Sequence, residues 1–163
     1  MFTNKRILIG YDGSNGGKAA LAAAATIAER FESQVTALWV REPLPRHSDL
    51  PGEFEAEAEA ADEYFEERQK EVAAVAAQYG LSIPCEVRRG HAAKILVGFA
   101  REGAYDLIVV GHSDHSELWG RLLGDTADRI SDHAHCSVLI VKTGPALPGV
   151  SAAPWSSNPK SSL

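Results

Sequence analysis

A chain of 163 residues, 45% of them hydrophobic, has the length and composition of one globular domain with a sizeable core. Its net charge of −6 and its lack of any lysine- and arginine-rich run argue against nonspecific nucleic-acid binding and against attraction to an anionic membrane surface. No stretch approaches the roughly 20 apolar residues of a membrane span, and the N-terminus carries no hydrophobic signal segment, so we expect a cytoplasmic protein.

The first quarter of the chain predicts a strand, a loop, a helix and a second strand. Lys5–Gly10 is a short apolar run, and Tyr11–Gly17 is rich in turn-forming residues. Lys18–Phe31 carries its apolar residues at helical spacing, and Gln34–Val40 is mostly apolar and β-prone. Near-continuous apolar strands are typical of a sheet covered on both faces.

After a proline-rich loop at 43–51, a long helix is expected from about Glu53 to Tyr79, with Gly80 as its stop. Its inward face is mostly apolar and comprises Phe54, Ala58, Ala61, Phe65, Arg68, Val72, Val75 and Tyr79. Its other side carries Glu55, Glu59, Asp62, Glu63, Glu66 and Glu67, which suit a solvated helix face or, alternatively, a surface for a protein partner.

The second half continues the alternation and ends in a tail. The expected elements are a strand at Ile83–Arg88, a helix from Ala92 ending at Gly103, a strand at Tyr105–Val110, a helix at Asp125–His133 and a strand at Ser137–Val141. Residues 143–163 are rich in Pro, Ser and Gly and are expected to form a flexible C-terminal tail. Cys85 and Cys136 match no metal-ligand spacing and are expected to be buried, reduced thiols.

This strand–helix alternation predicts an α/β fold with a single doubly wound, five-stranded parallel sheet. Such sheets bind ligands beyond the carboxyl ends of their strands, at the point where the strand order reverses. Two loops compete for that place, Tyr11–Gly17 after the first strand and Gly111–Gly124 after the fourth. The first lacks the Lys-Ser/Thr of a P-loop.

Gly111 and Gly124 are candidate phosphate-site glycines. Gly111 directly follows a buried strand, where a glycine lets the backbone approach a ligand closely. Gly124 precedes a helix, whose free N-terminal amides attract anions. The alternative is that both glycines serve turn geometry alone.

The chain from about Lys5 to Lys142 resembles the universal stress protein family. The resemblance rests on ILIGYDGS, VTALWV, GHAAKILVGFA, YDLIVVGH and HCSVLIVK, each at the expected relative position. It implies one domain over residues 1–142 with strand order 3-2-1-4-5, a Rossmann-like fold of the adenine nucleotide alpha-hydrolase type. The family includes members that bind ATP and members that do not.

Nucleotide-binding members carry Gly-x-x-Gly-x9-Gly-Ser/Thr after the fourth strand. Gly111 and Gly124 match the first and third glycines, but Asp114 replaces the second and Asp125 replaces the Ser/Thr. A carboxylate near 4 Å from a phosphate charge costs about 4 kcal/mol at an effective dielectric of ~20, before relaxation or metal bridging. The two departures together argue against tight ATP binding.

Other residues leave nucleotide binding open. Thr126 offers a displaced hydroxyl, Arg121 a positive charge, and a divalent cation could bridge Asp114 or Asp125 to phosphate. Alternatively, Asp125 caps its own helix and occupies the amides that a phosphate would use.

The resemblance also places Asp12 at the nucleotide and Val40 at the adenine. For Asp12, the alternative is a turn aspartate bonded to the amides of Ser14 or Asn15. For Val40, the alternative is simple burial. The run His112–His115 could supply metal ligands, but no further ligand is identifiable, and we expect no metal site and no catalytic residue.

We therefore expect a non-enzymatic stress-response protein that acts as a homodimer and through protein contacts, with weak or absent ATP binding. The expected dimer contact, which the resemblance implies, is the edge of the fifth strand at Val138, Leu139, Ile140 and Val141. The alternative is a switch that binds ATP or AMP, with Mg²⁺, at Asp12, Val40, Gly111, Gly124, Asp125 and Thr126.

Overall fold

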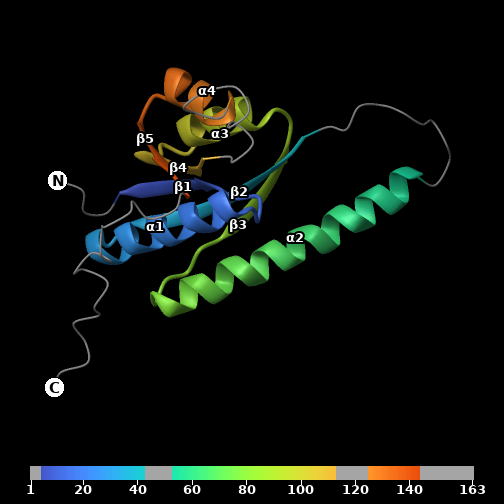
Figure 1. Cartoon of the computed structure of the whole chain (residues 1–163), viewed down its shortest axis with the longest axis horizontal. Helices are drawn as coiled ribbons and strands as arrows, with labels where there is room; N and C mark the ends of the chain where they lie inside the picture. The colour runs from blue at the N-terminus through green and yellow to red at the C-terminus, as the bar shows by residue number, and fades with distance from the viewer. Residues whose placement is uncertain (1–4, 43–52, 113–124, 144–163) are drawn as a thin grey trace, which may run out of the picture.

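The computed structural model describes residues 5–42, 53–112 and 125–143, apart from the side chains of residues 53–55 and 125. Strands and helices alternate throughout (Figure 1). In chain order they are β1 (Arg6–Gly10), α1 (Asn15–Phe31), β2 (Gln34–Arg41), α2 (Glu53–Gln78), β3 (Cys85–Arg89), α3 (Ala92–Glu102), β4 (Leu107–Gly111), α4 (Asp125–His133) and β5 (Ser137–Val141).

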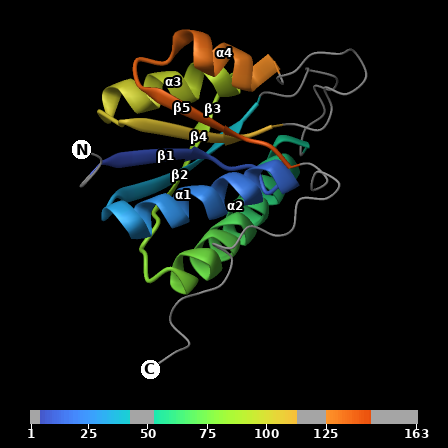
Figure 2. The same cartoon turned by 60° about the vertical axis from the view of Figure 1, so that its left-hand side comes forward.

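The five strands form one parallel sheet in the order β3-β2-β1-β4-β5, which confirms the predicted fold. Figure 2 shows α1 and α2 on one face of the sheet and α3 and α4 on the other. The chain therefore runs outward from β1 to β3 and then crosses back to β4. The strand order reverses between β1 and β4, which is the switch point of the sheet.

Side-chain alternation along the central strands builds two cores. Ile7 and Ile9 face α1 and α2, where Leu21 and Val72 are buried with them. Leu8 faces the opposite way, into a cluster of residues from α3, α4 and the neighbouring strands. Because both faces of the sheet are covered, the central strands are continuously apolar.

Three elements begin two or three residues away from their predicted starts. Helix α1 begins at Asn15 rather than Lys18, because the Ser14 side chain caps it by accepting from the Gly17 amide. Strand β3 begins at Cys85 rather than Ile83. Strand β4 begins at Leu107 rather than Tyr105, because the Tyr105 amide bonds back to the Ala100 carbonyl and closes the end of α3.

The two cysteines are free, as predicted, but half-buried rather than buried. Each lies on or beside an outer strand of the sheet, Cys85 in β3 and Cys136 just before β5, where only one neighbouring strand covers it. Burial is the main cause that raises the pKa of both thiols. The tail predicted from residue 143 lies outside the described residues beyond Thr143. None of the described helices is long and apolar enough to cross a lipid bilayer.

Candidate functional site

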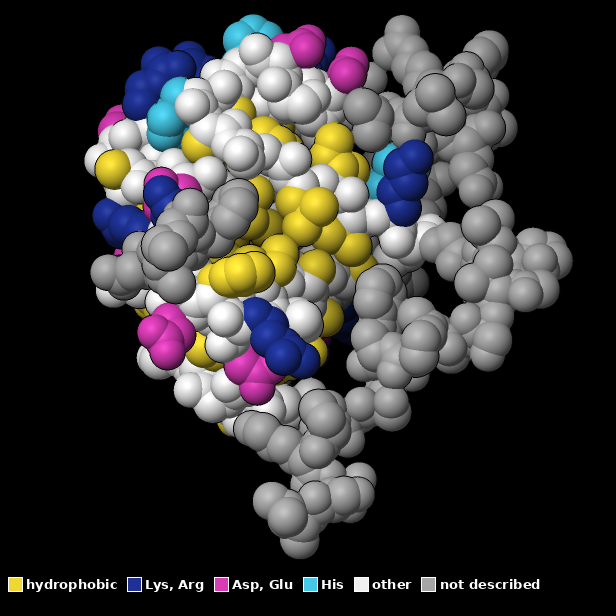
Figure 3. Space-filling model, turned by 90° about the vertical axis from the view of Figure 1, so that its left-hand side faces the viewer, with side chains coloured by type: hydrophobic (Ala, Val, Ile, Leu, Met, Phe, Trp, Pro, Cys, Tyr) yellow, Lys and Arg dark blue, Asp and Glu magenta, His cyan; other side chains and the backbone are white. Residues whose placement is uncertain are grey.

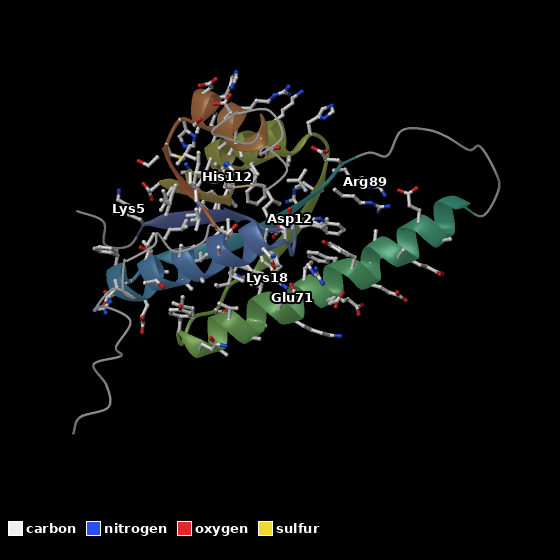
Figure 4. All side chains as sticks on the ribbon, viewed as in Figure 1. Lys5, Asp12, Lys18, Glu71, Arg89 and His112 are labelled. Atoms are coloured by element: carbon white, nitrogen blue, oxygen red, sulfur yellow. The ribbon has the colours of Figure 1, made fainter. Side chains whose placement is uncertain are left out.

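The candidate site lies at the carboxyl ends of β1, β2 and β4, where the fold places its switch point. The structure brings Asp12, Val40 and Gly111 to this edge from three neighbouring strands. Figure 4 labels Asp12 at the end of β1 and His112 at the end of β4. The Tyr11 amide still donates to the Leu38 carbonyl at 3.0 Å, so the ends of β1 and β2 stay joined up to the loop.

The loop after β1 satisfies its own polar groups. The Asp12 carboxylate accepts from the Ser14 amide at 3.0 Å and from the Ser14 hydroxyl at 2.6 Å. The same hydroxyl oxygen accepts from the Gly17 amide at 3.1 Å. The turn role foreseen for Asp12 is therefore confirmed, and one free amide at the start of α1 is used within the chain.

Gly111 makes a close approach, but its neighbour is another glycine of the same chain. A Cβ built on Gly111 would lie 2.2 Å from the carbonyl carbon of Gly16. A Cβ on Gly16 would lie 2.7 Å from the His112 carbonyl oxygen. The first turn of α1 therefore packs backbone to backbone against the end of β4, and no side chain fits between them.

Helix α2 lies across the loop after β1. The Tyr64 hydroxyl donates a short hydrogen bond to the Asp12 carbonyl. The Arg68 guanidinium lies over Gly13, where a built Cβ would be 2.1 Å from Nη1. Gly13 itself has a φ of +77°, a conformation that favours glycine. The Tyr64 ring packs on Trp39 of β2 with centroids 4.9 Å apart.

Next to this contact, Tyr11, Glu67, Arg68 and Glu71 form a small cluster of hydrogen bonds and ion pairs. The Tyr11 hydroxyl donates to the Glu71 carboxylate at 2.5 Å, and Arg68 pairs with the other Glu71 oxygen at 3.1 Å. Arg68 also pairs with Glu67 at 2.9 Å and lies 4.5 Å from the Tyr64 ring centroid. Burial, followed by the hydrogen bond to Glu71, raises the pKa of Tyr11, which keeps its hydroxyl protonated.

The remaining predicted site residues are only partly described. Val40 is half-buried and packs against the α3–α4 side of the core. Thr126 is exposed in the first turn of α4. Asp125 begins α4, but its side chain, and therefore its proposed capping role, lies outside the described residues, as do Asp114, Arg121 and Gly124.

Most of the run proposed as metal ligands also lies outside the described residues, since only His112 is described. Within residues 5–42, 56–112 and 126–143, His, Cys, Asp and Glu side chains form no group of three that could hold a metal ion.

Sequence reasoning missed Tyr64, Arg68 and Gly16 at this edge. One signal was present: Arg68 sits in the inward stripe of α2, where an arginine needs carboxylate or aromatic partners. The partners of Tyr64 and Gly16 come from elements distant in sequence, and the pattern within one element does not specify them.

Comparison with known proteins places the chain in a family. A model of the Universal stress protein family matches residues 3–142. A universal stress protein of Methanocaldococcus jannaschii is 36% identical over 140 residues, which is 85% of this chain and 82% of that protein.

Solved structures agree with this assignment. The universal stress protein UspA from Lactobacillus plantarum superposes with a TM-score of 0.67 at 27% identity, over 85% of this chain and 98% of its own. A universal stress protein solved in complex with cAMP shares the fold, with a TM-score of 0.64 at 24% identity over 86% of this chain and 98% of its own. The chain belongs to the universal stress protein family.

Proposed function

We propose that this protein is a non-catalytic stress-response protein that works as a homodimer and binds ATP weakly or not at all. The observation that carries the proposal is the internally satisfied loop at the end of β1. The Asp12 carboxylate is engaged by Ser14, the Asp12 carbonyl by Tyr64, and the face of Gly13 by Arg68. A nucleotide must replace these contacts before it gains any of its own.

The phosphate side of the site supports the same proposal. Asp114 and Asp125 stand where nucleotide-binding relatives carry a glycine and a hydroxyl, and both carboxylates repel terminal phosphates. The close packing of Gly16 on Gly111 places this chain's own backbone beside a glycine at which a ligand was expected to approach.

The proposed dimer uses the outer edge of β5. Figure 1 places β5 on its left-hand side, and Figure 3, which shows that side face-on, has hydrophobic side chains gathered at its centre. Val138, Leu139, Ile140 and Val141 are half-buried on this edge, and β5 pairs with β4 alone among the described strands. An uncovered apolar strand edge favours pairing with a second copy.

Isothermal titration with Mg-ATP tests the nucleotide part. We expect no heat up to millimolar ATP for the wild type, and micromolar binding after Asp114→Gly with Asp125→Ser, which restores the glycine and the hydroxyl. Asp128→Ser with Asp132→Ser is the matched control, because it removes two exposed carboxylates of α4 outside the motif. Micromolar ATP binding by the wild type, or equal gain in the control, contradicts the proposal.

A second candidate is a switch that responds to AMP or ATP, with a divalent cation. It is favoured by one observation: the departures from the motif are confined to the phosphate side, whereas Asp12 stays exposed at the adjoining strand end. AMP carries less phosphate charge than ATP and suffers less from Asp114 and Asp125. The same titration with AMP separates the candidates, since micromolar AMP binding by the wild type supports the switch.

A further inference from the structure

Helix α2 contacts the end of β1 through three consecutive turns. Tyr64 bonds to the Asp12 carbonyl, Arg68 covers Gly13, and Glu71 accepts from Tyr11. These three α2 residues follow one another at spacings of three and four, so they lie on one face of the helix. Figure 4 shows Glu71 on α2 on the side of the molecule that faces the end of β1.

The side chains of Tyr64 and Arg68 cover this side of the loop. A single carbon added to Gly13 would lie 2.1 Å from Arg68 Nη1 and 2.7 Å from Arg68 Cδ, which is far inside van der Waals contact. The Tyr64 hydroxyl occupies the Asp12 carbonyl, and the Tyr64 ring covers part of Trp39. A ligand that contacts the Asp12 carbonyl or the face of Gly13 from this side must therefore displace the Tyr64 and Arg68 side chains.

Helix α2 is anchored most firmly at the C-terminal side of this contact. Val72 and Ala76, in its C-terminal half, are 0% and 3% exposed in the core shared with α1. Towards the N-terminus most side chains are exposed, and Figure 1 shows that half projecting past the sheet. This half is held by the rings of Tyr64 and Phe65, which pack on Trp39 with centroids 4.9 and 6.0 Å apart. The ion pair between Arg41 and Glu57, at 2.9 Å, is partly exposed and contributes little.

Arg68 itself is an imperfectly satisfied group. Its guanidinium pairs with Glu67 and Glu71, but its Nε is buried without a hydrogen-bond partner among the described residues. A buried donor without a partner lowers the stability of the arrangement that buries it. The contact of Arg68 with Gly13 is therefore less favourable than one in which every donor of the guanidinium is hydrogen-bonded.

We propose that α2 is an autoinhibitory element: Tyr64 and Arg68 occupy the end of β1 and compete with an adenine nucleotide for Asp12 and Gly13. This inference rests on the proposed function, because it names the element that keeps nucleotide binding weak. Nucleotide binding and the contact of α2 with the end of β1 then oppose each other. A variant that weakens this contact raises the apparent nucleotide affinity in proportion to the fraction of molecules whose site is free.

Titration of AMP into two variants of the full chain tests the proposal. Tyr64→Phe removes one hydroxyl and preserves the ring, so it is the conservative variant. Tyr64→Phe with Arg68→Ala also uncovers Gly13. The matched controls are Tyr79→Phe and Tyr79→Phe with Lys70→Ala, which make the same kinds of change on or beside α2, away from β1. Circular dichroism and urea unfolding establish that each variant is folded.

We expect AMP affinity to rise several-fold in Tyr64→Phe and at least tenfold in the double variant, with no rise in either control. Equal or weaker affinity in both Tyr64 variants overturns the proposal, because α2 would then be neutral or would contribute to the site. An equal rise in the controls also overturns it. Micromolar ATP binding by the wild type contradicts the proposed function instead, whatever the ratio between variant and wild type.

Discussion

Gly111 is a single residue whose close packing explains why this position of the motif is a glycine. The sequence predicted that this glycine lets the backbone approach a ligand closely, whereas in the structure the close approach is to a group of the same chain. The group in question is Gly16, which the sequence left unmarked among the turn-forming residues of the first loop. A sequence pattern can predict that a position has no room for a side chain, but only the folded structure shows which segment lies against that position.

Gly111→Ala is expected to destabilise the protein by about 1–3 kcal/mol, because the added Cβ would overlap Gly16 and force α1 away from β4. Gly98→Ala is the control, since a Cβ at Gly98 in α3 meets nothing within 4 Å and gains about 0.5–1 kcal/mol of helix propensity. Urea unfolding measures both. Equal stability of the two variants would contradict the described contact.

Tyr11→Phe should lower stability near neutral pH by about 1–2 kcal/mol, because it removes a hydrogen bond to a carboxylate. Burial and Glu71 raise the pKa of Tyr11 above its ordinary value of about 10. The native state thus holds a proton that the unfolded chain releases above about pH 10, so this contribution is complete below that pH and declines above it.

The wild type should therefore lose up to about 1.4 kcal/mol per pH unit more than Tyr11→Phe above about pH 10. Unfolding by urea at a series of pH values measures the two slopes. Parallel curves for wild type and variant across that range would mean that Tyr11 ionises as it does in the unfolded chain.

At the scale of elements, periodicity predicted every strand and helix that the structure describes. Helix α4 and strand β5 have the predicted bounds, and α2 ends one residue early, at Gln78. Boundaries differ from the prediction where a loop residue hydrogen-bonds to the end of a helix. Ser14 does so at the start of α1, and Tyr105 does so at the end of α3. Contacts between elements, such as Tyr64 on Asp12, could not be predicted, because their partners are far apart in sequence.

Helix α3 is capped at its N-terminus by Glu42, the residue that follows β2. Its own N-cap residue, His91, makes no side-chain cap, and the Glu42 carboxylate accepts from the Ala92 amide at 3.1 Å. Glu42→Ala should cost about 0.5–1.5 kcal/mol, and His91→Ser in that background should restore part of the loss. Glu102→Ala, at the other end of α3, should be neutral. Thermal melting measures all four proteins, and a neutral Glu42→Ala would exclude this cap.

At the scale of the whole molecule, the backbone direction of β5 makes the proposed dimer testable. The Val141 carbonyl accepts from the His112 amide, so Val141 faces β4, and Ile140, one residue away, directs its amide outward. Ile140→Pro should therefore remove an intersubunit hydrogen bond and leave the pairing with β4 in place. We expect a monomer in analytical ultracentrifugation, with helix content retained.

Val87→Pro is the matched control for that prediction. Val87 lies on β3, the opposite outer strand, and is 36% exposed. The Gly90 amide donates to the Arg41 carbonyl, and this register directs the amide of Val87 outward as well. The control should remain a dimer. A monomeric Val87→Pro with a dimeric Ile140→Pro would move the interface to the other side of the sheet.

The long α2 also has a mechanical consequence. Its N-terminal residue, Glu53, lies about 28 Å along the helix axis from the buried Val72, at a rise of about 1.5 Å per residue. A tilt of roughly 10° about Val72 would therefore displace the tip by about 5 Å, whereas Arg68, about 6 Å from the pivot, would move by only about 1 Å. For any tilt about Val72, the displacement at the N-terminal end of α2 would therefore be several times larger than the displacement beside Gly13.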